Sequence, residues 1–234
     1  RACHMMGPAA VSSWDGRALR QLCECQTCLR DGHSSSHNDR SHDQSLEQQF
    51  ILDGHDPIQI RGGSTKCARS LSRWIEQHLD QFNLKDSDVV EVGSGTGLVG
   101  IVLARLGARS VLSTDQEPVL DILNDNIELN NSRNNITVAP LYWGDELPSS
   151  FSDKNIVVGS DLIFAKENIP LLLRTFDMLV KSSSQQILFA HIDRFAWEAE
   201  FFKGMQELGF DEESVIIDDD IKVFQFRRKP KSPE

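Results

Sequence analysis

Short apolar segments alternate with segments of helical periodicity along this 234-residue chain, and no other feature restricts its possible folds as much. The alternation begins beyond Phe50 and continues to Phe226. The run from Val89 to Val92, for example, stops at Gly93, as a buried parallel strand does. Strands that alternate with helices predict a mainly parallel, doubly wound α/β sheet.

The boundaries of the expected elements follow from these patterns. In the first helix, apolar residues recur at steps of three and four, which predicts one buried stripe. The expected helices cover residues 66–79, 97–106, 118–127, 169–180 and 194–208. The expected strands cover residues 89–92, 111–115, 136–141, 156–159, 187–190, 215–217 and 223–226. The last two strands flank the acidic turn Asp218–Asp220, so we expect an antiparallel C-terminal hairpin.

Residues 1–46 differ in composition from the rest of the chain. The stretch 30–45 is rich in Ser, His and Asp and nearly lacks branched apolar residues, so we expect residues 1–46 to be a flexible extension and residues 47–230 to be the folded domain. The same extension holds Cys23, Cys25 and Cys28, followed by two histidines. Three thiols and an imidazole can bind zinc, but C-x-C is an unusual spacing and a second C-x₂-C pair is missing. We therefore predict no metal site and keep zinc as the alternative.

Charge and cysteine content restrict the partners and the compartment. The chain has 35 acidic and 24 basic residues, which argues against a general affinity for nucleic acid. No apolar run approaches the ~20 residues of a membrane span, and the N-terminus lacks the apolar core of a signal peptide. Five cysteines, an odd number, argue against a disulfide framework. We expect an intracellular protein, cytoplasmic or nuclear, without membrane contact and of unknown oligomeric state.

A glycine-rich turn joins the first predicted strand of the sheet to the next helix. It reads Glu91-Val-Gly-Ser-Gly-Thr-Gly97. Glycine allows a sharp turn and lets a ligand approach the main-chain amides. Asp115 ends the following strand, where its carboxylate can accept hydrogen bonds from two ribose hydroxyls. This combination predicts a nucleoside-containing ligand.

Two such ligands compete, and a tight turn without a ligand is a third interpretation. A dinucleotide site requires G-x-G-x-x-G, but position 98 is leucine. Glu91 would repel a pyrophosphate, whereas it could orient an ammonium group or the amides of the turn. S-adenosylmethionine carries an amino-acid cation and a ribose and has no phosphate, so it fits the turn better.

From about Ser64 to Phe226, the chain resembles the seven-β-strand S-adenosylmethionine-dependent methyltransferases, in particular the family of small protein-lysine methyltransferases. Four segments carry the resemblance: E-V-G-S-G-T-G-L-V-G-I from Glu91, S-T-D ending at Asp115, L-Y-W-G from Leu141, and G-S-D-L-I-F ending at Phe164. The resemblance implies the strand order 3-2-1-4-5-7-6, with cofactor and substrate at the carboxyl ends of the strands.

The resemblance also implies roles for single residues. Gly93, Ser94 and Gly95 would contact the methionine part of the cofactor, Asp115 the ribose and Trp143 the adenine. The full set of implied cofactor-binding residues is Glu91, Gly93, Ser94, Gly95, Gly97, Asp115, Trp143 and Ser160. Asp161 and Phe164 match the ends of the D-x-x-Y motif near the methyl-transfer site and are the implied catalytic residues.

The chain departs from the family pattern at two places. Phe164 replaces the tyrosine of the motif, so no phenol oxygen is present there. Thr65 and Lys66 occupy the positions of a Trp-Asp pair, so one cofactor contact is missing or supplied elsewhere.

These residues lead us to expect a protein-lysine N-methyltransferase acting on an intracellular, non-histone protein. Asp161 would orient the neutral amine, and Phe164 would face the methylammonium product. Simpler interpretations give Asp161 the role of capping the next turn, and give Trp143 and Phe164 the role of packing. Alternative functions are methylation of another side chain or of a small molecule, and a non-catalytic binding module with this fold.

Overall fold

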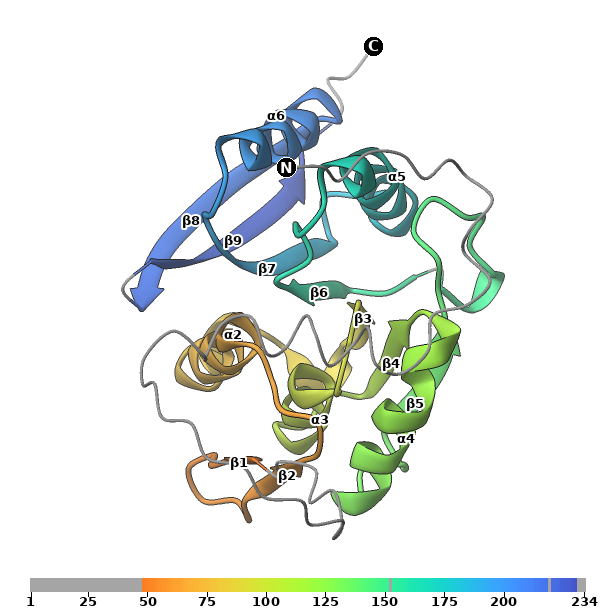
Figure 1. The fold of residues 1–234 in the computed structure, drawn as a ribbon, viewed down its shortest axis with the longest axis vertical. Helices are drawn as coiled ribbons and strands as arrows, with labels where there is room; N and C mark the ends of the chain where they lie inside the picture. The colour runs from red at the N-terminus through yellow and green to blue at the C-terminus, as the bar shows by residue number, and fades with distance from the viewer. Residues whose placement is uncertain (1–47, 152, 219, 231–234) are drawn as a thin grey trace, which may run out of the picture. The chain divides into compact units, whose positions relative to one another are not determined.

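The structure is a computed structural model that describes residues 48–151, 153–218 and 220–230 (Figure 1). The predicted flexible extension, residues 1–46, and the cysteine cluster within it lie outside the described residues. The central sheet contains β3 (Asp88–Val92), β4 (Ser110–Asp115), β5 (Ile136–Pro140), β6 (Ile156–Ser160), β7 (Gln186–Ile192), β8 (Phe210–Asp218) and β9 (Ile221–Arg228). The helices are α2 (Lys66–Gln77), α3 (Leu98–Arg105), α4 (Leu120–Leu129), α5 (Ile169–Leu179) and α6 (Ala199–Glu207).

The spatial order of the seven strands is β5-β4-β3-β6-β7-β9-β8. Counted from β3 as the first strand, this order reads 3-2-1-4-5-7-6. The strands β3 to β7 pair in parallel, and β9 pairs antiparallel with both β7 and β8. The predicted doubly wound, mainly parallel fold with a C-terminal hairpin is therefore confirmed.

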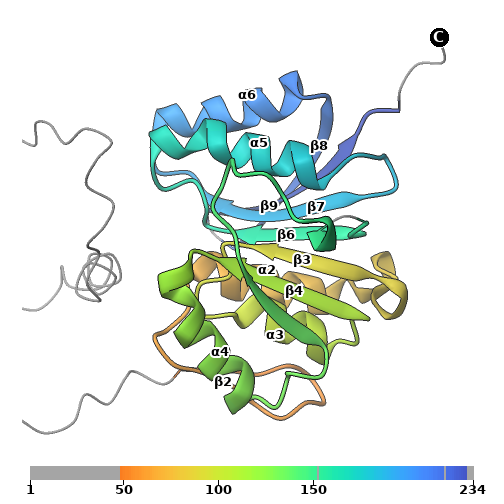
Figure 2. The ribbon, with the colours of Figure 1, turned by 90° about the vertical axis from the view of Figure 1, so that its right-hand side faces the viewer.

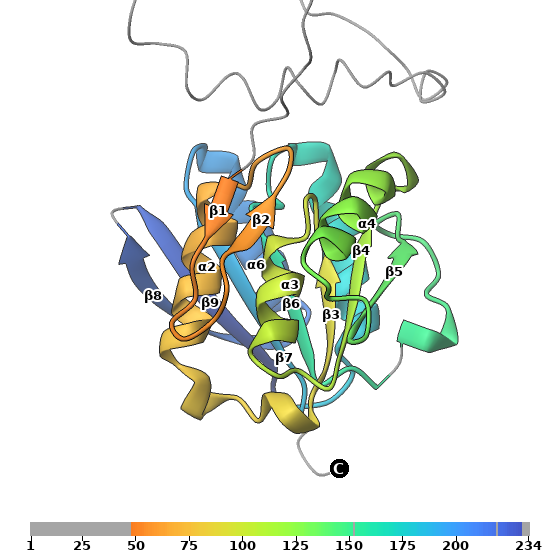
Figure 3. The same ribbon diagram turned by 90° about the horizontal axis from the view of Figure 1, so that it is seen from below.

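Helices cover both faces of this sheet. Figures 2 and 3 show α2, α3 and α4 along one face and α5 and α6 along the other. Neighbouring residues of a strand point to opposite faces, so β3 supplies Val89 to the first core and Val90 and Val92 to the second. Burial on both faces explains why these strands are continuous apolar runs.

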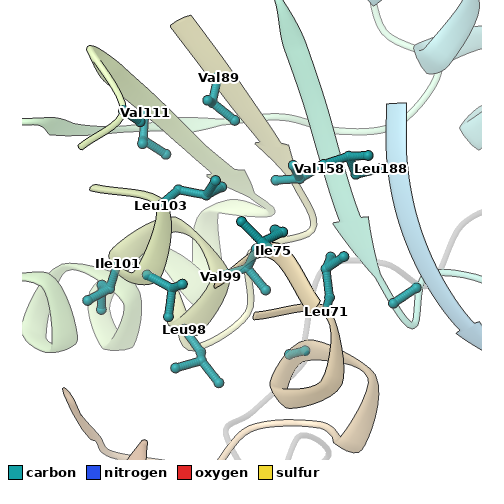
Figure 4. Packing of buried hydrophobic residues seen from close by; sticks show 14 of the residues in the cluster. Leu71, Ile75, Val89, Leu98, Val99, Ile101, Leu103, Val111, Val158 and Leu188 are labelled. Carbon is teal, nitrogen blue, oxygen red and sulfur yellow. The ribbon is translucent and has the colours of Figure 1, made fainter. Parts of the chain in front are cut away.

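The first core fills the space between the sheet and the helices α2 and α3 (Figure 4). Leu71 and Ile75 lie four residues apart on α2 and are buried in the same cluster as Val99 of α3. Val158 of β6 and Leu188 of β7 form the floor of this cluster. The three- and four-residue steps found in the sequence of α2 thus correspond to one buried stripe.

The second core is rich in aromatic side chains. Phe176 of α5, Phe189 of β7 and Phe201 of α6 have ring centroids 5.4–6.3 Å apart, and two of the three ring pairs meet edge to face. All three side chains are fully buried. Their packing holds α5 and α6 against the sheet.

No helix in the described part of the chain combines the length and the apolar character that crossing a membrane requires.

Three elements differ from the sequence-based expectation in their boundaries: β8, β9 and the last helix. The strands β8 and β9 are longer than the predicted 215–217 and 223–226. β8 is the edge of the sheet, and residues 211–214 are polar and largely solvent-facing, so no apolar run marks them. The helix expected at 194–208 starts with a 3₁₀ turn at Ala196–Glu198 and continues as α6.

A second, two-stranded sheet precedes α2 and was not predicted. It consists of β1 (Gln48–Phe50) and β2 (Ile58–Ile60), which pair antiparallel. Each strand has only three residues, too few for a period-of-two pattern to be recognised in the sequence. Phe50, Ile58 and Ile60 are buried in the first core.

Two asparagines, Asn126 of α4 and Asn130 directly after its last residue, bind the backbone of β2 and of the residue after it. Asn130 accepts from the amide of Gln59 (2.9 Å) and donates to its carbonyl (2.7 Å). Asn126 makes the same pair of bonds with Arg61 (2.9 and 3.0 Å) and also donates to the carbonyl of Thr96 (2.9 Å). The two asparagines lie four residues apart and so share one face of the helix end. Their side-chain amides therefore bond the backbone at β2 as a neighbouring strand would.

Asn126→Ala should lower the free energy of unfolding by roughly 1–3 kcal/mol, because alanine cannot make the three hydrogen bonds that Asn126 forms with the backbone of Arg61 and Thr96. Urea unfolding monitored by circular dichroism measures this loss. Asn124→Ala is the matched control. Among the described residues, the Asn124 amide donates to the carbonyl of Leu120, one turn earlier on the same helix, and accepts from the exposed Arg133. Equal losses in both variants would contradict the structural role of Asn126.

Candidate active site

The carboxyl ends of parallel strands bring the predicted site residues to one edge of the sheet. Val92 at the end of β3 is in register with Thr114 of β4 and with Gly159 of β6. The next residues along the chain are Gly93, directly after β3, and Asp115 and Ser160, the last residues of β4 and β6. In open α/β sheets this edge is where ligands bind.

The glycine-rich turn requires glycine at two positions. Gly93 has a φ of +65°, and a Cβ there would lie 2.6 Å from Cδ2 of Leu162. Gly97 has a φ of +86°, and a Cβ there would lie 2.5 Å from Cδ1 of Leu123. Side chains would therefore be both strained and in collision at these positions. Gly97 lets α3 begin close to α4, and Gly93 leaves the main chain accessible beside Trp143.

Asp115 is tied to the turn and retains capacity to accept further hydrogen bonds. Its Oδ2 accepts from the amide of Gly95 (2.7 Å), and its Oδ1 accepts from the amide of Gln116 (2.7 Å). Partial burial raises the pKa of Asp115, while these two hydrogen bonds act in the opposite direction. A carboxylate has about four lone-pair positions, so each oxygen can still accept one hydroxyl group. This is the capacity needed to bind a ribose.

Glu91 lies beneath the turn and supports it from the buried side. The residue is 3% exposed, and its Oε2 accepts from the hydroxyl of Ser113 (2.8 Å). The carboxylate also interacts with the hydroxyl of Ser94 and the amide of Gly100. Burial raises the pKa of Glu91 to about 7, and these hydrogen bonds oppose the increase. Glu91 therefore holds the turn and the start of α3 in place.

Gly100 is a site residue that the sequence analysis missed. A Cβ at this position would lie 2.5 Å from Oε2 of Glu91, so glycine is needed for the carboxylate to fit against α3. The signal was available in the sequence, because a glycine in the interior of a helix requires a packing reason.

Two aromatic side chains lie beside the turn. The rings of Trp143 and Phe164 are 5.8 Å apart with an interplanar angle of 48°. A Cβ at Gly93 would lie 3.6 Å from Cζ2 of Trp143, which places the indole at the turn. Trp143 also packs against the second core, whereas Phe164 is 59% exposed. Simple core packing thus accounts for part of the Trp143 surface but not for Phe164.

Asp161 follows β6 in a left-handed backbone conformation, with a φ of +62°. Aspartate tolerates this conformation better than most residues. Its amide donates to the carbonyl of Ala190 (2.9 Å), which fixes the turn to β7. The Oδ1 of Asp161 forms an ion pair with Nη2 of Arg194, and the two side chains are 17% and 23% exposed. Arg194, expected to begin a helix, instead lies in the loop after β7 and reaches this site.

Cys67, on the first turn of α2, was also missed. It is 1% exposed, and its thiol interacts with the carboxylate of Asp161. Burial, followed by the charge of Asp161, raises the pKa of this thiol to about 12, so the thiol remains protonated. Its only signal in the sequence is its position directly after Thr65 and Lys66. Thr65 itself caps α2, its hydroxyl accepting from the amide of Ala68 (3.1 Å).

His191, Asp193 and Glu198 have potential metal-ligand atoms within 4.8 Å of one another. Oε2 of Glu198 lies 3.1 Å from Nε2 of His191 and accepts from the amide of Arg194 (2.8 Å), and Oδ2 of Asp193 accepts from Lys222 (2.5 Å). Nδ1 of His191 and Oε1 of Glu198 are buried without a hydrogen-bond partner among the described residues. The contacts of Glu198 and Asp193 shape the loop after β7.

The arrangement fits S-adenosylmethionine in three respects. Gly93 leaves room at the main chain, where a Cβ would otherwise project. Asp115 has free acceptor positions for the ribose, and Trp143 presents a partly exposed ring beside the turn. The fold and these residues define a Rossmann-like, S-adenosylmethionine-dependent methyltransferase.

Residues 64–208 match the family model described as lysine methyltransferase, and this chain belongs to that family. It is 37% identical over 150 residues to the Xenopus tropicalis protein N-lysine methyltransferase METTL21A, covering 62% of this chain and 67% of the relative. It is 36% identical over 180 residues to the Mus musculus protein-lysine methyltransferase METTL21E, covering 71% and 72%. The predicted family and the S-adenosylmethionine-dependent protein-lysine methyltransferase activity are thereby confirmed.

Solved structures agree with the fold. A ribosomal protein L11 methylase from Lactobacillus delbrueckii subsp. bulgaricus superposes with a TM-score of 0.57 at 20% identity, covering 72% of this chain and 81% of that one. The magnesium protoporphyrin IX methyltransferase of Synechocystis, solved with bound SAH, superposes with a TM-score of 0.55 at 15% identity, covering 69% and 83%.

Glu91→Gln should remove a pH dependence of stability. The raised pKa means that the folded state binds this proton more tightly than the unfolded chain does. The resulting stability is complete below the ordinary value of 4.5 and is lost as pH rises through about 7. Relative to the variant, the wild type should lose up to about 3 kcal/mol between pH 5 and pH 8.

Urea unfolding at both pH values tests this expectation, with Glu117→Gln as the exposed control. A glutamine side chain can still accept from Gly100 and donate to Ser113, so the variant should fold. Parallel pH profiles of wild type and Glu91→Gln would contradict the assignment.

Asp115→Ala should weaken binding of S-adenosylhomocysteine by roughly 1.5–3 kcal/mol, the scale of hydrogen bonds to a charged group. Isothermal titration calorimetry gives the affinity, and a thermal melt shows whether the variant is folded. Asp121→Ala, an exposed aspartate on α4, should bind like the wild type. Unchanged affinity in folded Asp115→Ala would remove Asp115 from the cofactor site.

Proposed function

We propose that this enzyme methylates a lysine of an intracellular, non-histone protein and that Asp161 orients the acceptor amine. The acidic composition of the chain supports a basic protein segment as the partner and argues against nucleic acid. One relative, 30% identical over 156 residues, is the Xenopus tropicalis EEF1A lysine methyltransferase 3, and its name supports a defined protein target. The odd number of cysteines supports a reducing compartment, the cytoplasm or the nucleus.

The observation that carries this proposal is the position of Asp161. It follows β6 at the same sheet edge as the glycine-rich turn, in a region that packs against Gly93 through Leu162. Its carboxylate is partly exposed and points toward the loop after β7. A lysine side chain that enters here meets a hydrogen-bond acceptor beside the cofactor site.

When bound, S-adenosylmethionine supplies a methyl group on a positively charged sulfur, and an amine lone pair displaces that sulfur as the N–C bond forms and the S–C bond breaks. A lysine amine has a pKa of about 10.4 in water, so it must first release a proton to solvent. Asp161 would accept a hydrogen bond from the neutral amine and so direct its lone pair. Orientation of this kind accounts for a large part of the rate of two-reactant enzymes.

Phe164 and Trp143 would form the aromatic wall of the acceptor site. A partly methylated amine is a cation with apolar methyl groups, and aromatic rings attract such groups. Phe164 lacks the phenol oxygen of the family motif, so its contribution is the ring face. Since the side chain is 59% exposed, a tyrosine hydroxyl at this position would reach solvent without a clash.

Asp161→Asn should reduce methyl transfer by about 100-fold or more, because it keeps the shape of the side chain but removes its charge. The measurement is transfer of tritiated methyl groups from S-adenosylmethionine to proteins of a cell extract. S-adenosylhomocysteine should bind with nearly unchanged affinity. Asp211→Asn, which removes the charge of an exposed β8 residue, is the control and should be fully active. Phe164→Tyr should also be active.

The outcomes separate the alternative functions. The proposal is supported if a protein is labelled and amino-acid analysis identifies the labelled residue as methyl-lysine. Labelling of small molecules alone contradicts it. Absence of transfer by a wild-type protein that binds the cofactor would favour a non-catalytic binding module. Full activity of Asp161→Asn would mean that other groups hold the acceptor.

A further inference from the structure

The carboxylate assigned to the acceptor is already paired with a cation of the same chain. Oδ1 of Asp161 contacts Nη2 of Arg194, and both side chains are largely buried, 17% and 23% exposed. Asp161 follows β6, and Arg194 follows the neighbouring strand β7. This ion pair therefore belongs to the same sheet edge as the cofactor site.

The loop that carries Arg194 is held by buried contacts. Glu198, 2% exposed, accepts from the amides of Arg194 (2.8 Å) and Phe195 (3.3 Å) through Oε2. The same oxygen lies 3.1 Å from Nε2 of His191, which is fully buried. The backbone of Arg194 is therefore fixed, and its guanidinium is placed beside Asp161 before any acceptor arrives.

A lone carboxylate would be a poor partner for a lysine that has to react as a neutral amine. An opposite charge within ~4–6 Å stabilises the charged form of a titrating group, by about 1–3 pKa units. A lysine beside an unpaired Asp161 would therefore be held as the unreactive ammonium ion. A guanidinium at the same place cancels this effect and leaves the carboxylate able to accept a hydrogen bond.

We propose that Arg194 is a positioning residue that neutralises the Asp161 carboxylate at the acceptor site, so that the target amine is oriented there without being trapped as an ammonium ion. This inference rests on the proposed role of Asp161 in lysine methylation. It adds a second residue to that site and explains why a partly buried carboxylate can serve a nucleophile that must lose its proton.

Two further titratable groups feel the charge of Asp161, Cys67 of α2 and His191 of β7. Burial and the charge of Asp161 raise the pKa of Cys67 to about 12, so the thiol stays uncharged through neutral pH. Burial lowers the pKa of His191, which keeps the imidazole neutral above pH 7, and Oε2 of Glu198 lies 3.1 Å from Nε2 of that ring. Lys66 contributes a more distant positive charge that is felt at Cys67. Arg194 is the group that forms an ion pair with Asp161.

The first test uses n-butylammonium as a mimic of the lysine side chain and needs no acceptor protein. Arg194→Gln exposes the charge of Asp161 to the ligand, so n-butylammonium should bind at least about 10-fold more tightly at pH 7 than to the wild type. The measurement is an NMR titration of the S-adenosylhomocysteine complex at constant ionic strength. Neutral n-butanol is the matched ligand and should bind both proteins equally.

Three variants control for structure and net charge. Arg194→Lys retains the cation and should bind n-butylammonium as weakly as the wild type does. The double variant Asp161→Asn with Arg194→Gln should lose the gain, because no carboxylate remains. Arg133→Gln removes an exposed arginine that pairs with Glu128 and should change nothing.

The second test is the pH dependence of methyl transfer to the protein that the extract assay labels. In Arg194→Gln the alkaline rise in kcat should move upward by about 1 pH unit. The rate should therefore fall about 10-fold at pH 7.5 and approach the wild-type rate as the pH is raised to 9.5. Arg194→Lys should keep the wild-type profile, with intact mass confirming that the new lysine is not itself methylated.

A merely structural role would lower the rate equally at all pH values and would leave n-butylammonium binding unchanged, and either result would overturn the inference. If the wild type labels no acceptor, the proposed function fails, whereas the n-butylammonium titration still decides the role of Arg194. If Arg194→Gln does not fold, Arg194→Met removes the same positive charge while keeping a long apolar side chain, and the n-butylammonium titration of that variant makes the same comparison.

Discussion

The parallel pairing of β3 with both β4 and β6 is the constraint on which the site depends. Because these strands run in the same direction, the residues after Val92, the carboxylate of Asp115 and the turn at Asp161 all emerge at one edge. β4 and β6 are the neighbours of β3 on its two sides. The helices α3 and α4 lie on one face of the sheet, and α5 lies on the other (Figure 2). The carboxyl edge at this switch in strand order is the place where open α/β sheets bind ligands.

Glycine-loop geometry is maintained by a buried acid. Glu91 carries a desolvation cost that appears as a pKa raised to about 7, and this cost persists because the carboxylate satisfies the hydroxyl of Ser113 and the amide of Gly100 at once. Stability is thus exchanged for a fixed position of the turn. A site that must hold Gly93 and Gly95 in left-handed conformations requires such a fixed support from below.

Sequence patterns were sufficient for the fold and for placing the glycine-rich turn and Asp115 at the same edge of the sheet. The strand before Gly93, the helix after Gly97 and the acid at Asp115 are local signals that physical chemistry connects directly to a backbone conformation. The hairpin of β1 and β2 was not predicted because its strands are short. The side chains that hold the backbone at β2 are asparagines 65 to 71 residues further along the chain. The pairing of Asp161 with Arg194 spans 33 residues and depends on a positive φ and on a loop shaped by Glu198, none of which leaves a periodic pattern.

Three carboxylates at one sheet edge now have three distinct electrostatic environments. Glu91 is buried beneath the turn with neutral hydrogen-bond donors, Asp115 receives two amides and keeps free lone pairs, and Asp161 is paired with a guanidinium. Separate environments allow acids of the same type to perform different tasks at one pH. In the proposed site, Glu91 supports the turn rigidly, Asp115 keeps lone pairs free to accept hydrogen bonds from the ribose, and Asp161 orients the amine without stabilising its charged form. Of these three roles, only the one proposed for Asp161 requires a permanent countercharge, and Arg194 lies beside Asp161 to provide it.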